Sequence, residues 1–223
     1  RKLANAIDDR DLDAFGGPDA AADSFSPIQK AMDFAMTSFW TTGGIRGKMK
    51  DPTKYQARGF NMGVSRKVFE STGGFVDPNH GEDIEWSIRI KKSGYQLELV
   101  EEAFVYHKRK NSLLSFAKQS FSFGRNRVNV SRFHSGAIKP VHWLPTLFLT
   151  FCLSIPIFYF VSKSLFQLSL GLFATWSVAV MFSSTVQNKE FQVGLLSWVT
   201  SVLQLWSYGL GLPLELVKKV TKG

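Results

Sequence analysis

Residues 81–90 read GEDIEWSIRI, and this stretch decides how the neighbouring sequence is interpreted. Its apolar residues alternate with other types, as they would in a β-strand. Three acidic residues in the first turn, two lysines at the end and Gly94 just beyond them favour a helix instead. We therefore predict a helix that begins with the carboxylate pair Glu82 and Asp83.

Short elements of both types are expected around this helix. Ser26 followed by Pro27 is typical of a helix start, and apolar residues follow at helical spacing. Alternating residues predict short strands at 95–99 and 103–106, and a histidine follows the second strand. Residues 1–110 are therefore predicted to form an α/β unit.

The formal charge of +9 is concentrated in one segment. Residues 103–139 hold eight lysines and arginines and no acidic residue, whereas residues 1–102 hold 14 against 16 acids. A basic segment just before the first long apolar stretch is typical of the cytoplasmic side of a membrane protein. Because phenylalanines lie among these cations, residues 111–139 are predicted to be a basic amphipathic segment in the lipid headgroup zone, not a nucleic-acid site.

Three stretches near the C-terminus contain no charged residue, and they are 141–162, 164–188 and 191–214. Each is long enough to cross a hydrocarbon core of about 30 Å, so residues 140–223 are predicted to hold about three transmembrane helices. The single cysteine, Cys152, lies in the first stretch, which argues against a disulfide framework. Three spans would place the basic C-terminal tail opposite the basic segment, against the positive-inside tendency. Either the larger basic patch sets the orientation or one stretch is re-entrant.

The surroundings of Asp83 suggest chemistry beyond helix capping. A carboxylate at a helix N-terminus stabilises the helix by about 0.3 to 1 kcal/mol, and this role alone would explain the pair. Glycines at 59 and 63 leave the backbone free to approach a ligand, although a tight turn in a core strand would also explain them. His107 ends a predicted strand and is followed by three cations. A base beside a cationic surface fits group transfer from a phosphate-bearing donor.

Several short motifs, in a fixed order, resemble those of a known enzyme family. They are Phe60-Asn61-Met62-Gly63, Thr72-Gly73-Gly74-Phe75, Gly81-Glu82-Asp83 with Ser87-Ile88-Arg89-Ile90, and Ala103-Phe104-Val105-Tyr106-His107-Lys108. With Phe15-Gly16-Gly17-Pro18 they resemble the acceptor-side half of membrane-associated family 2 glycosyltransferases, over roughly Leu12 to Arg127. The resemblance implies a partial GT-A fold, which is Rossmann-like and of the α/β class, followed by an all-α transmembrane region.

The resemblance also implies roles for individual residues. Asp83 would be the general base that takes the proton from the acceptor hydroxyl, allowing inversion at the anomeric carbon, and Glu82 would position the acceptor. His107 would lie near a divalent cation, Mg²⁺ or Mn²⁺, and near the donor diphosphate. The remaining candidates are Asn61, Met62 and Trp86 for the acceptor, and Lys108, Arg109 and Arg125 for the diphosphate.

By the same resemblance the donor is a nucleotide sugar, the acceptor is a lipid-linked or cell-surface glycan, and membrane lipids are further partners. The expected location is the bacterial inner membrane, with several membrane crossings and a cytoplasmic catalytic part. The Asp-x-Asp motif that binds the cation in this family is expected upstream of Arg1. These 223 residues alone are therefore expected to be inactive.

Two alternatives stay open. A noncatalytic membrane-anchoring or scaffold subunit would use the basic aromatic segment to hold anionic lipid, but it would not need the carboxylate pair or His107. A processive polysaccharide synthase would carry a Gln-x-x-Arg-Trp motif, whereas Gln119 is followed by Phe123-Gly124-Arg125 without a tryptophan. The basic loop at residues 43–50 suits either a cover over a phosphate-bearing substrate or a solvated loop.

Overall fold

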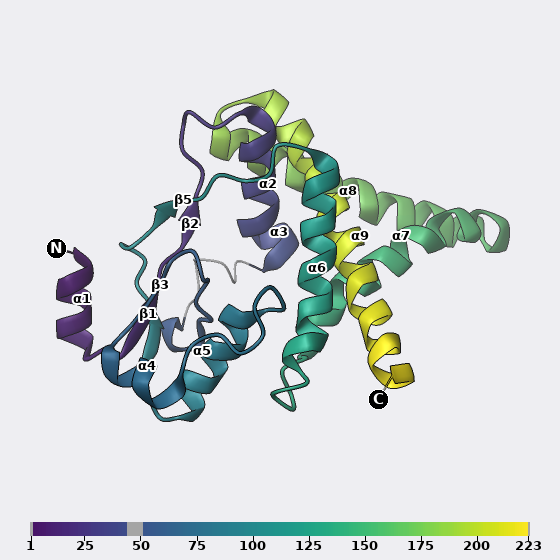
Figure 1. Cartoon of the computed structure of the whole chain (residues 1–223). Helices are drawn as coiled ribbons and strands as arrows, with labels where there is room; N and C mark the ends of the chain where they lie inside the picture. The colour runs from purple at the N-terminus through teal and green to yellow at the C-terminus, as the bar shows by residue number, and fades with distance from the viewer. Residues whose placement is uncertain (1, 44–50, 223) are drawn as a thin grey trace.

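The computed structural model describes residues 2–43 and 51–222, which form a small α/β part and a helical part (Figure 1). The elements of the α/β part are, in order, α1 (Lys2–Arg10), β1 (Ala14–Gly16), β2 (Asp19–Ala20), α2 (Pro27–Thr37), α3 (Phe39–Thr42), η1 (Pro52–Lys54), β3 (Met62–Val64), α4 (Arg66–Thr72), α5 (Glu82–Lys92), β4 (Leu97–Leu99) and β5 (Val105–Tyr106). The helical part consists of α6 (Leu113–Val130), η2 (Pro140–Trp143), α7 (Leu144–Val161), α8 (Lys163–Asn188) and α9 (Phe191–Lys222). The predicted basic loop lies outside the described residues, except for Gly43.

Two small sheets form the centre of the α/β part and agree with the predicted α/β class. β1 lies between β3 and β4, antiparallel to β3 with Phe15 opposite Gly63 and parallel to β4 with Phe15 opposite Glu98. β2 and β5 form a separate parallel pair. A Cβ on Gly63 would lie 2.1 Å from Cε1 of the Phe15 ring. Gly63 is therefore required by packing in the sheet and not by a ligand.

α5 confirms the predicted helix at the carboxylate motif. Gly81 precedes it with a φ of 90°, a left-handed conformation that favours glycine. A Cβ on Gly81 would also lie 2.8 Å from Cγ2 of Val130, the last residue of α6. Glycine at this position lets α5 begin directly against α6. The carboxylate pair therefore lies at the boundary between the α/β part and the helical part.

The core of the α/β part forms between α5 and the three-stranded sheet. Trp86 and Ile90 of α5 pack with Leu97 and Leu99 of β4, and all four side chains are buried. The indole Nε1 of Trp86 donates a hydrogen bond to Thr72 Oγ1 at 2.9 Å, so its polar atom is satisfied inside the core. Trp86 thus fixes α5 against the sheet.

α6 and α9 cross in close contact because glycines at the crossing let the two backbones approach. A Cβ on Gly124 of α6 would lie 2.3 Å from the carbonyl oxygen of Tyr208 in α9. A Cβ on Gly211 of α9 would lie 2.2 Å from the carbonyl oxygen of Phe121 in α6. The predicted amphipathic segment therefore packs on another helix along one side, and its placement in the headgroup zone stays a prediction.

The predicted third transmembrane span at residues 191–214 lies within α9, a helix that packs on other helices of the protein. Polar residues interrupt its apolar face and are buried against other helices, as where Thr200 Oγ1 donates to the carbonyl of Ala31 in α2 at 3.0 Å. Near its end, Lys219 Nζ donates to Ser131 Oγ at 3.1 Å, beside the end of α6. Two helices of the described chain are long and apolar enough to cross a membrane, and α9 is not one of them.

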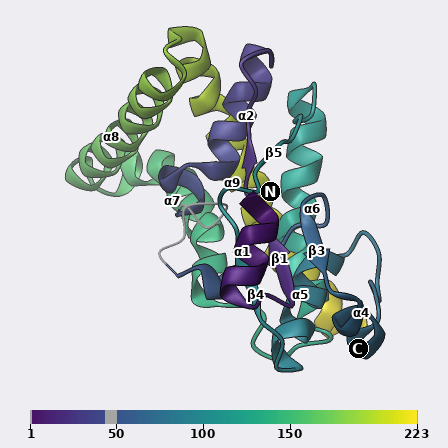
Figure 2. The ribbon, with the colours of Figure 1, turned by 90° about the vertical axis from the view of Figure 1, so that its left-hand side faces the viewer.

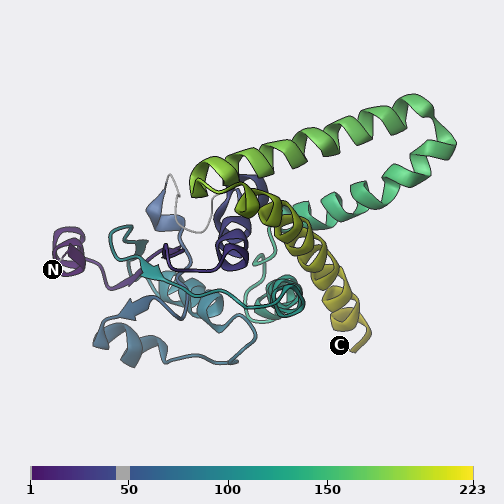
Figure 3. The same cartoon turned by 90° about the horizontal axis from the view of Figure 1, so that it is seen from above.

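The two candidate spans form a helical hairpin that projects from the rest of the molecule (Figure 3). They are Pro140–Val161, which includes η2 and α7, and α8. Large apolar side chains lie exposed on the hairpin, among them Phe160 and Phe182. α7 begins against α9, and α8 ends near α2 and α3, where Trp40 Nε1 donates to Ser183 Oγ at 3.0 Å (Figure 2). One end of the hairpin therefore lies against α9, and the other lies next to the α/β part.

Candidate active site

Asp83 lies in the first turn of α5, where backbone N–H groups hold its carboxylate. The N–H of Gly59 donates to Oδ2 at 3.2 Å, and the N–H of Ile84 donates to Oδ1 at 2.7 Å. Glu82 lies beside it, and its Oε2 accepts the N–H of Gly81 at 3.1 Å. Asp83 is half-buried, so its carboxylate is oriented by the backbone and still within reach of a ligand.

Ser87 and Glu85 tie α5 to its surroundings. The buried hydroxyl of Ser87 donates to the carbonyl of Asp83 at 2.7 Å and accepts the N–H of Ala57 at 3.1 Å. Glu85 is also buried, and its Oε1 lies 3.1 Å from Nε2 of His134, which follows α6. These contacts hold the start of α5 between the segment before Gly59 and the end of α6. They therefore fix the position of the Asp83 carboxylate.

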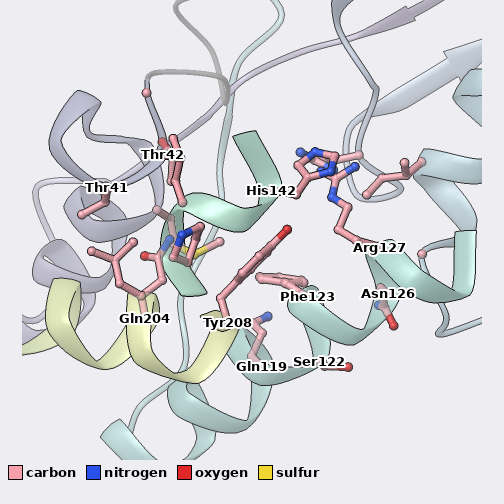
Figure 4. Close-up of a pocket in the computed structure, with 18 of the residues that line it drawn as sticks. Thr41, Thr42, Gln119, Ser122, Phe123, Asn126, Arg127, His142, Gln204 and Tyr208 are labelled. Atoms are coloured by element: carbon pink, nitrogen blue, oxygen red, sulfur yellow. The ribbon is translucent and has the colours of Figure 1, made fainter. Parts of the chain in front are cut away.

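The carboxylate pair lines a cavity of about 1160 Å³ between the α/β part and the helices. Several helices supply apolar or aromatic residues to its wall, among them Trp40 of α3, Phe123 of α6, Phe148 of α7, Trp176 of α8, and Leu205 and Tyr208 of α9. Figure 4 shows Phe123 and Tyr208 reaching into this space from α6 and α9. One cavity thus combines carboxylates with an extended apolar wall, which suits a ligand with a polar and an apolar portion.

Two buried arginines line the same cavity. Arg58 is 9% exposed and Arg127 is 8% exposed. Nη1 of Arg127 donates to Gln56 Oε1 at 3.2 Å, and the hydroxyl of Tyr208 points toward the same region (Figure 4). Burial lowers the pKa of Arg127 and the positive charge of Arg58 adds to this, while Tyr208 and Asp83 act in the opposite direction. The part of the cavity beside Asp83 is therefore cationic.

His107 follows β5 and lines this cavity together with the carboxylate pair. Its imidazole ring packs on Phe60, with ring centroids 4.1 Å apart and planes tilted by 33°. Lys110 also contributes to the wall, whereas Lys108 is exposed and is not among the residues that line the cavity. Of the predicted site residues, the two carboxylates, His107 and Arg109 thus line one cavity.

The three residues predicted to contact the acceptor lie outside the cavity wall. Nδ2 of Asn61 donates to the carbonyl of Ala103 at 2.7 Å and joins two loops. Met62 belongs to β3 and packs on the core that contains Trp86. These three side chains support the fold around the site.

The two arginines predicted to bind the donor diphosphate both form ion pairs with carboxylates. Arg109 is buried and pairs with Asp19 of β2 and with Asp33 of α2, with 2.8 Å between Nη2 and Asp33 Oδ1. Nε of Arg125 lies 2.7 Å from Oε2 of Glu215 and joins α6 to α9. Arg109 still contributes to the cavity wall, but both guanidinium groups are engaged by acidic side chains.

The described part of the chain holds no group of three His, Cys, Asp or Glu side chains that could bind a metal ion. Glu82, Asp83 and His107 line one cavity without forming such a group. The metal predicted at His107 would therefore need ligands beyond the described residues, and no catalytic step below is assigned to a metal.

Sequence reasoning did not identify Arg58, Arg127 and His142 as site residues, although all three line the cavity. The sequence feature that could have indicated Arg127 lies in α6, where Phe123 and Arg127 are four residues apart and share one helix face. That aromatic and cationic face was attributed to lipid headgroups. In the structure it also faces the carboxylate motif.

The carboxylate pair, the buried arginines and the apolar wall of one cavity fit an enzyme that acts on a partly apolar substrate. The chain belongs to the family described as Glycosyl transferase family group 2, which matches residues 3–206 and confirms the resemblance noted in the motifs. It is also similar to the succinoglycan biosynthesis protein ExoA of Rhizobium meliloti (strain 1021), at 27% identity over 105 residues. That match spans 47% of this chain and 32% of the relative's length. The chain therefore belongs to a family of glycosyltransferases, which argues against the scaffold alternative.

Proposed function

We propose that this protein transfers a sugar from a nucleotide-sugar donor to a lipid-linked glycan acceptor. The observation that best supports this is the shared cavity, in which Asp83 and Glu82 line the same space as Phe148 of α7 and Trp176 of α8. The carboxylates suit a sugar hydroxyl, and the aromatic wall suits a hydrocarbon carrier. A cell-surface glycan without a lipid would have no use for this wall, so the lipid-linked acceptor is favoured.

In the proposed reaction Asp83 is the general base. Its carboxylate takes the proton of the acceptor hydroxyl while the hydroxyl oxygen attacks the anomeric carbon of the donor. The bond from that carbon to the diphosphate oxygen breaks, and the nucleoside diphosphate leaves with the bonding electron pair. Attack from the face opposite the leaving group inverts the configuration at the anomeric carbon. Glu82 positions the acceptor beside the base.

The donor diphosphate is proposed to lie near His107 and Lys110. Both residues line the cavity, and the stacked Phe60 ring holds the imidazole in place. Imidazole and ammonium groups are suitable donors to phosphate oxygens, and they offset the charge that develops on the leaving group. Family 2 enzymes generally use a divalent cation, so the assays below include Mg²⁺ and Mn²⁺.

The α7–α8 hairpin is proposed to enter the bacterial inner membrane, with the α/β part in the cytoplasm. A hairpin crosses twice, so the basic segment at residues 103–139 and the basic end of α9 lie on one side. This arrangement follows the positive-inside tendency. The conflict that three spans created does not arise.

A cysteine at the tip of the hairpin is expected to be accessible only from outside the cell membrane. In a Cys152→Ala background, Ser162→Cys lies between α7 and α8, and Thr221→Cys lies at the end of α9. A membrane-impermeant maleimide should label Ser162→Cys in intact spheroplasts, and Thr221→Cys only after permeabilisation. Labelling of both positions before permeabilisation would contradict an even number of crossings.

The proposed function is tested by following a labelled sugar into lipid. Membrane vesicles that contain the complete protein are incubated with a panel of labelled nucleotide sugars and with Mg²⁺ or Mn²⁺. One nucleotide sugar should place its label in an organic-solvent-extractable product, with the anomeric configuration inverted relative to the donor. Label confined to water-soluble products, or retained configuration, would contradict the proposal.

A further inference from the structure

Arg58 is a buried cation whose polar atoms are incompletely satisfied. The residue is 9% exposed, and its Nε is buried without a hydrogen-bond partner among residues 2–43 and 51–222. Its side chain forms no ion pair with a carboxylate of these residues. An unpaired buried guanidinium N–H is costly in free energy, and a ligand atom in the cavity would satisfy it.

Arg127 lies close enough to Arg58 for the two charges to interact. Burial lowers the pKa of Arg127, and the charge of Arg58 lowers it as well. Two like charges in a buried place repel each other, and a bound anion beside both would relieve that repulsion. The arrangement of these arginines therefore calls for an anionic ligand group.

His142 of η2 adds a third donor to this part of the cavity. Its Nδ1 accepts the N–H of Lys139 at 3.0 Å, so the ring proton is carried by Nε2. Figure 4 shows His142 and Arg127 directed at the same region. The site thus offers two charged groups and one imidazole N–H, which matches the several acceptor oxygens of a phosphate.

The place of these donors in the cavity indicates which phosphate they bind. Arg127 interacts with the charge of Asp83 on one side, while His142 leads directly into α7, whose Phe148 belongs to the apolar wall. Along the cavity, the general base Asp83 therefore comes first, then Arg127 and His142, and then the apolar wall. A lipid-linked sugar has the matching order of hydroxyl, phosphate and hydrocarbon chain.

We propose that Arg58, Arg127 and His142 bind the phosphate group that joins the acceptor sugar to its lipid carrier. The proposal rests on the function proposed above and adds a limit on acceptor size. Because the cations lie close to Asp83, the acceptor phosphate lies close to the hydroxyl that reacts. The preferred acceptor therefore carries one sugar, or very few, on its lipid phosphate. The donor diphosphate is the other source of the same chemistry, and the experiments below separate the two.

Binding of the lipid phosphate is tested without any transfer. Geranylgeranyl diphosphate should raise the thermal unfolding midpoint of the complete protein in detergent more than geranylgeraniol, which has the same tail without phosphate. Arg127→Gln should remove this difference. The matched control Arg66→Gln changes an exposed arginine of α4 and should keep it. Equal midpoints with the diphosphate and the alcohol in the wild-type protein would overturn the proposal. Because no donor is present, this result is independent of the transfer assay.

Kinetics identify the source of the phosphate. With a lipid diphosphate that carries one sugar, Arg58→Gln and Arg127→Gln should each raise the acceptor KM roughly ten- to hundredfold, as expected for loss of a charged hydrogen bond. The donor KM should change by less than about twofold. A raised donor KM with an unchanged acceptor KM would assign the arginines to the donor diphosphate and overturn the proposal. Arg127→Lys retains the charge and serves as the second variant if Arg127→Gln does not fold.

Acceptor length gives an independent check on the same site. The wild-type enzyme should use the one-sugar lipid diphosphate with a kcat/KM at least about tenfold above that of a long oligosaccharide on the same lipid. Equal values would overturn the size limit, because the phosphate would then not need to lie near Asp83.

Discussion

Replacement of Asp83 by asparagine is expected to lower kcat by about 10²- to 10⁴-fold, the usual effect of losing a general base. Asparagine has nearly the same shape, and its side-chain oxygen can still accept the N–H of Gly59, which lies 3.2 Å from Oδ2 in the structure. An amide does not take up the hydroxyl proton, so the acceptor would attack unassisted. The measurement is the initial rate of sugar transfer at saturating donor and acceptor.

The matched control for Asp83→Asn is Glu101→Gln, which changes an exposed acid in the turn after β4. It should leave kcat within about twofold of the wild-type value. The thermal unfolding midpoint and the donor KM of Asp83→Asn should also stay close to those of the wild type, because Ser87 and Glu85 hold α5 independently of this carboxylate. A variant that keeps more than about a tenth of the wild-type kcat would remove Asp83 from the role of base.

The start of α5 could be predicted because its signals are local. Acids in the first turn and a preceding glycine depend on backbone geometry within a few residues, and Gly81 has the left-handed φ that this position needs. The start of α2 was predictable for the same reason, since Gln29 Oε1 accepts the N–H of Ser26 at 3.2 Å within one turn. Helix starts of this kind can be predicted because they depend only on residues that are neighbours in the sequence.

The roles of Asn61 and Trp86 could not be predicted from the motifs. The resemblance to the enzyme family implied contact with the acceptor for both residues. Their partners are distant in sequence, however: Asn61 bonds Ala103, and the Trp86 indole bonds Thr72. A motif does not show which of its residues contact a ligand and which support the fold. Tertiary contacts decide which of them face the cavity.

The third apolar stretch shows that hydropathy alone does not distinguish a lipid-facing helix from a helix packed on protein. An uncharged stretch rich in serine, threonine and glycine suits a helix packed tightly on other helices as well as a membrane span. In α9 the buried hydroxyls of Ser197 and Thr200 have protein partners, namely Ser184 in α8 and Ala31 in α2. The sequence does not show these contacts, and α9 is not among the two helices of the described chain that are long and apolar enough to cross a membrane.

Replacement of Arg109 by glutamine is expected to lower the free energy of unfolding by about 3–5 kcal/mol, because removal of one partner of a buried ion pair leaves uncompensated charge. Arg109 pairs with both Asp19 and Asp33, and its side chain is 4% exposed. At roughly 2–4 °C per kcal/mol for a chain of this size, the thermal unfolding midpoint should fall by about 6–20 °C. The neighbouring variant Lys108→Gln, which changes an exposed side chain, should leave the midpoint unchanged.

This result also decides between the two roles of Arg109. A ligand of the donor diphosphate predicts a raised donor KM with normal stability, whereas the ion pairs predict lost stability that can be rescued. Adding Asp19→Asn and Asp33→Asn to Arg109→Gln removes the two buried carboxylate charges that faced the guanidinium and should restore most of the lost midpoint, since polar amides can bond to one another without burying charge. Rescue by the two asparagines would assign Arg109 to holding β2 against α2, next to the cavity wall that carries His107 and Lys110. A stable Arg109→Gln protein with a raised donor KM would instead return Arg109 to the donor site.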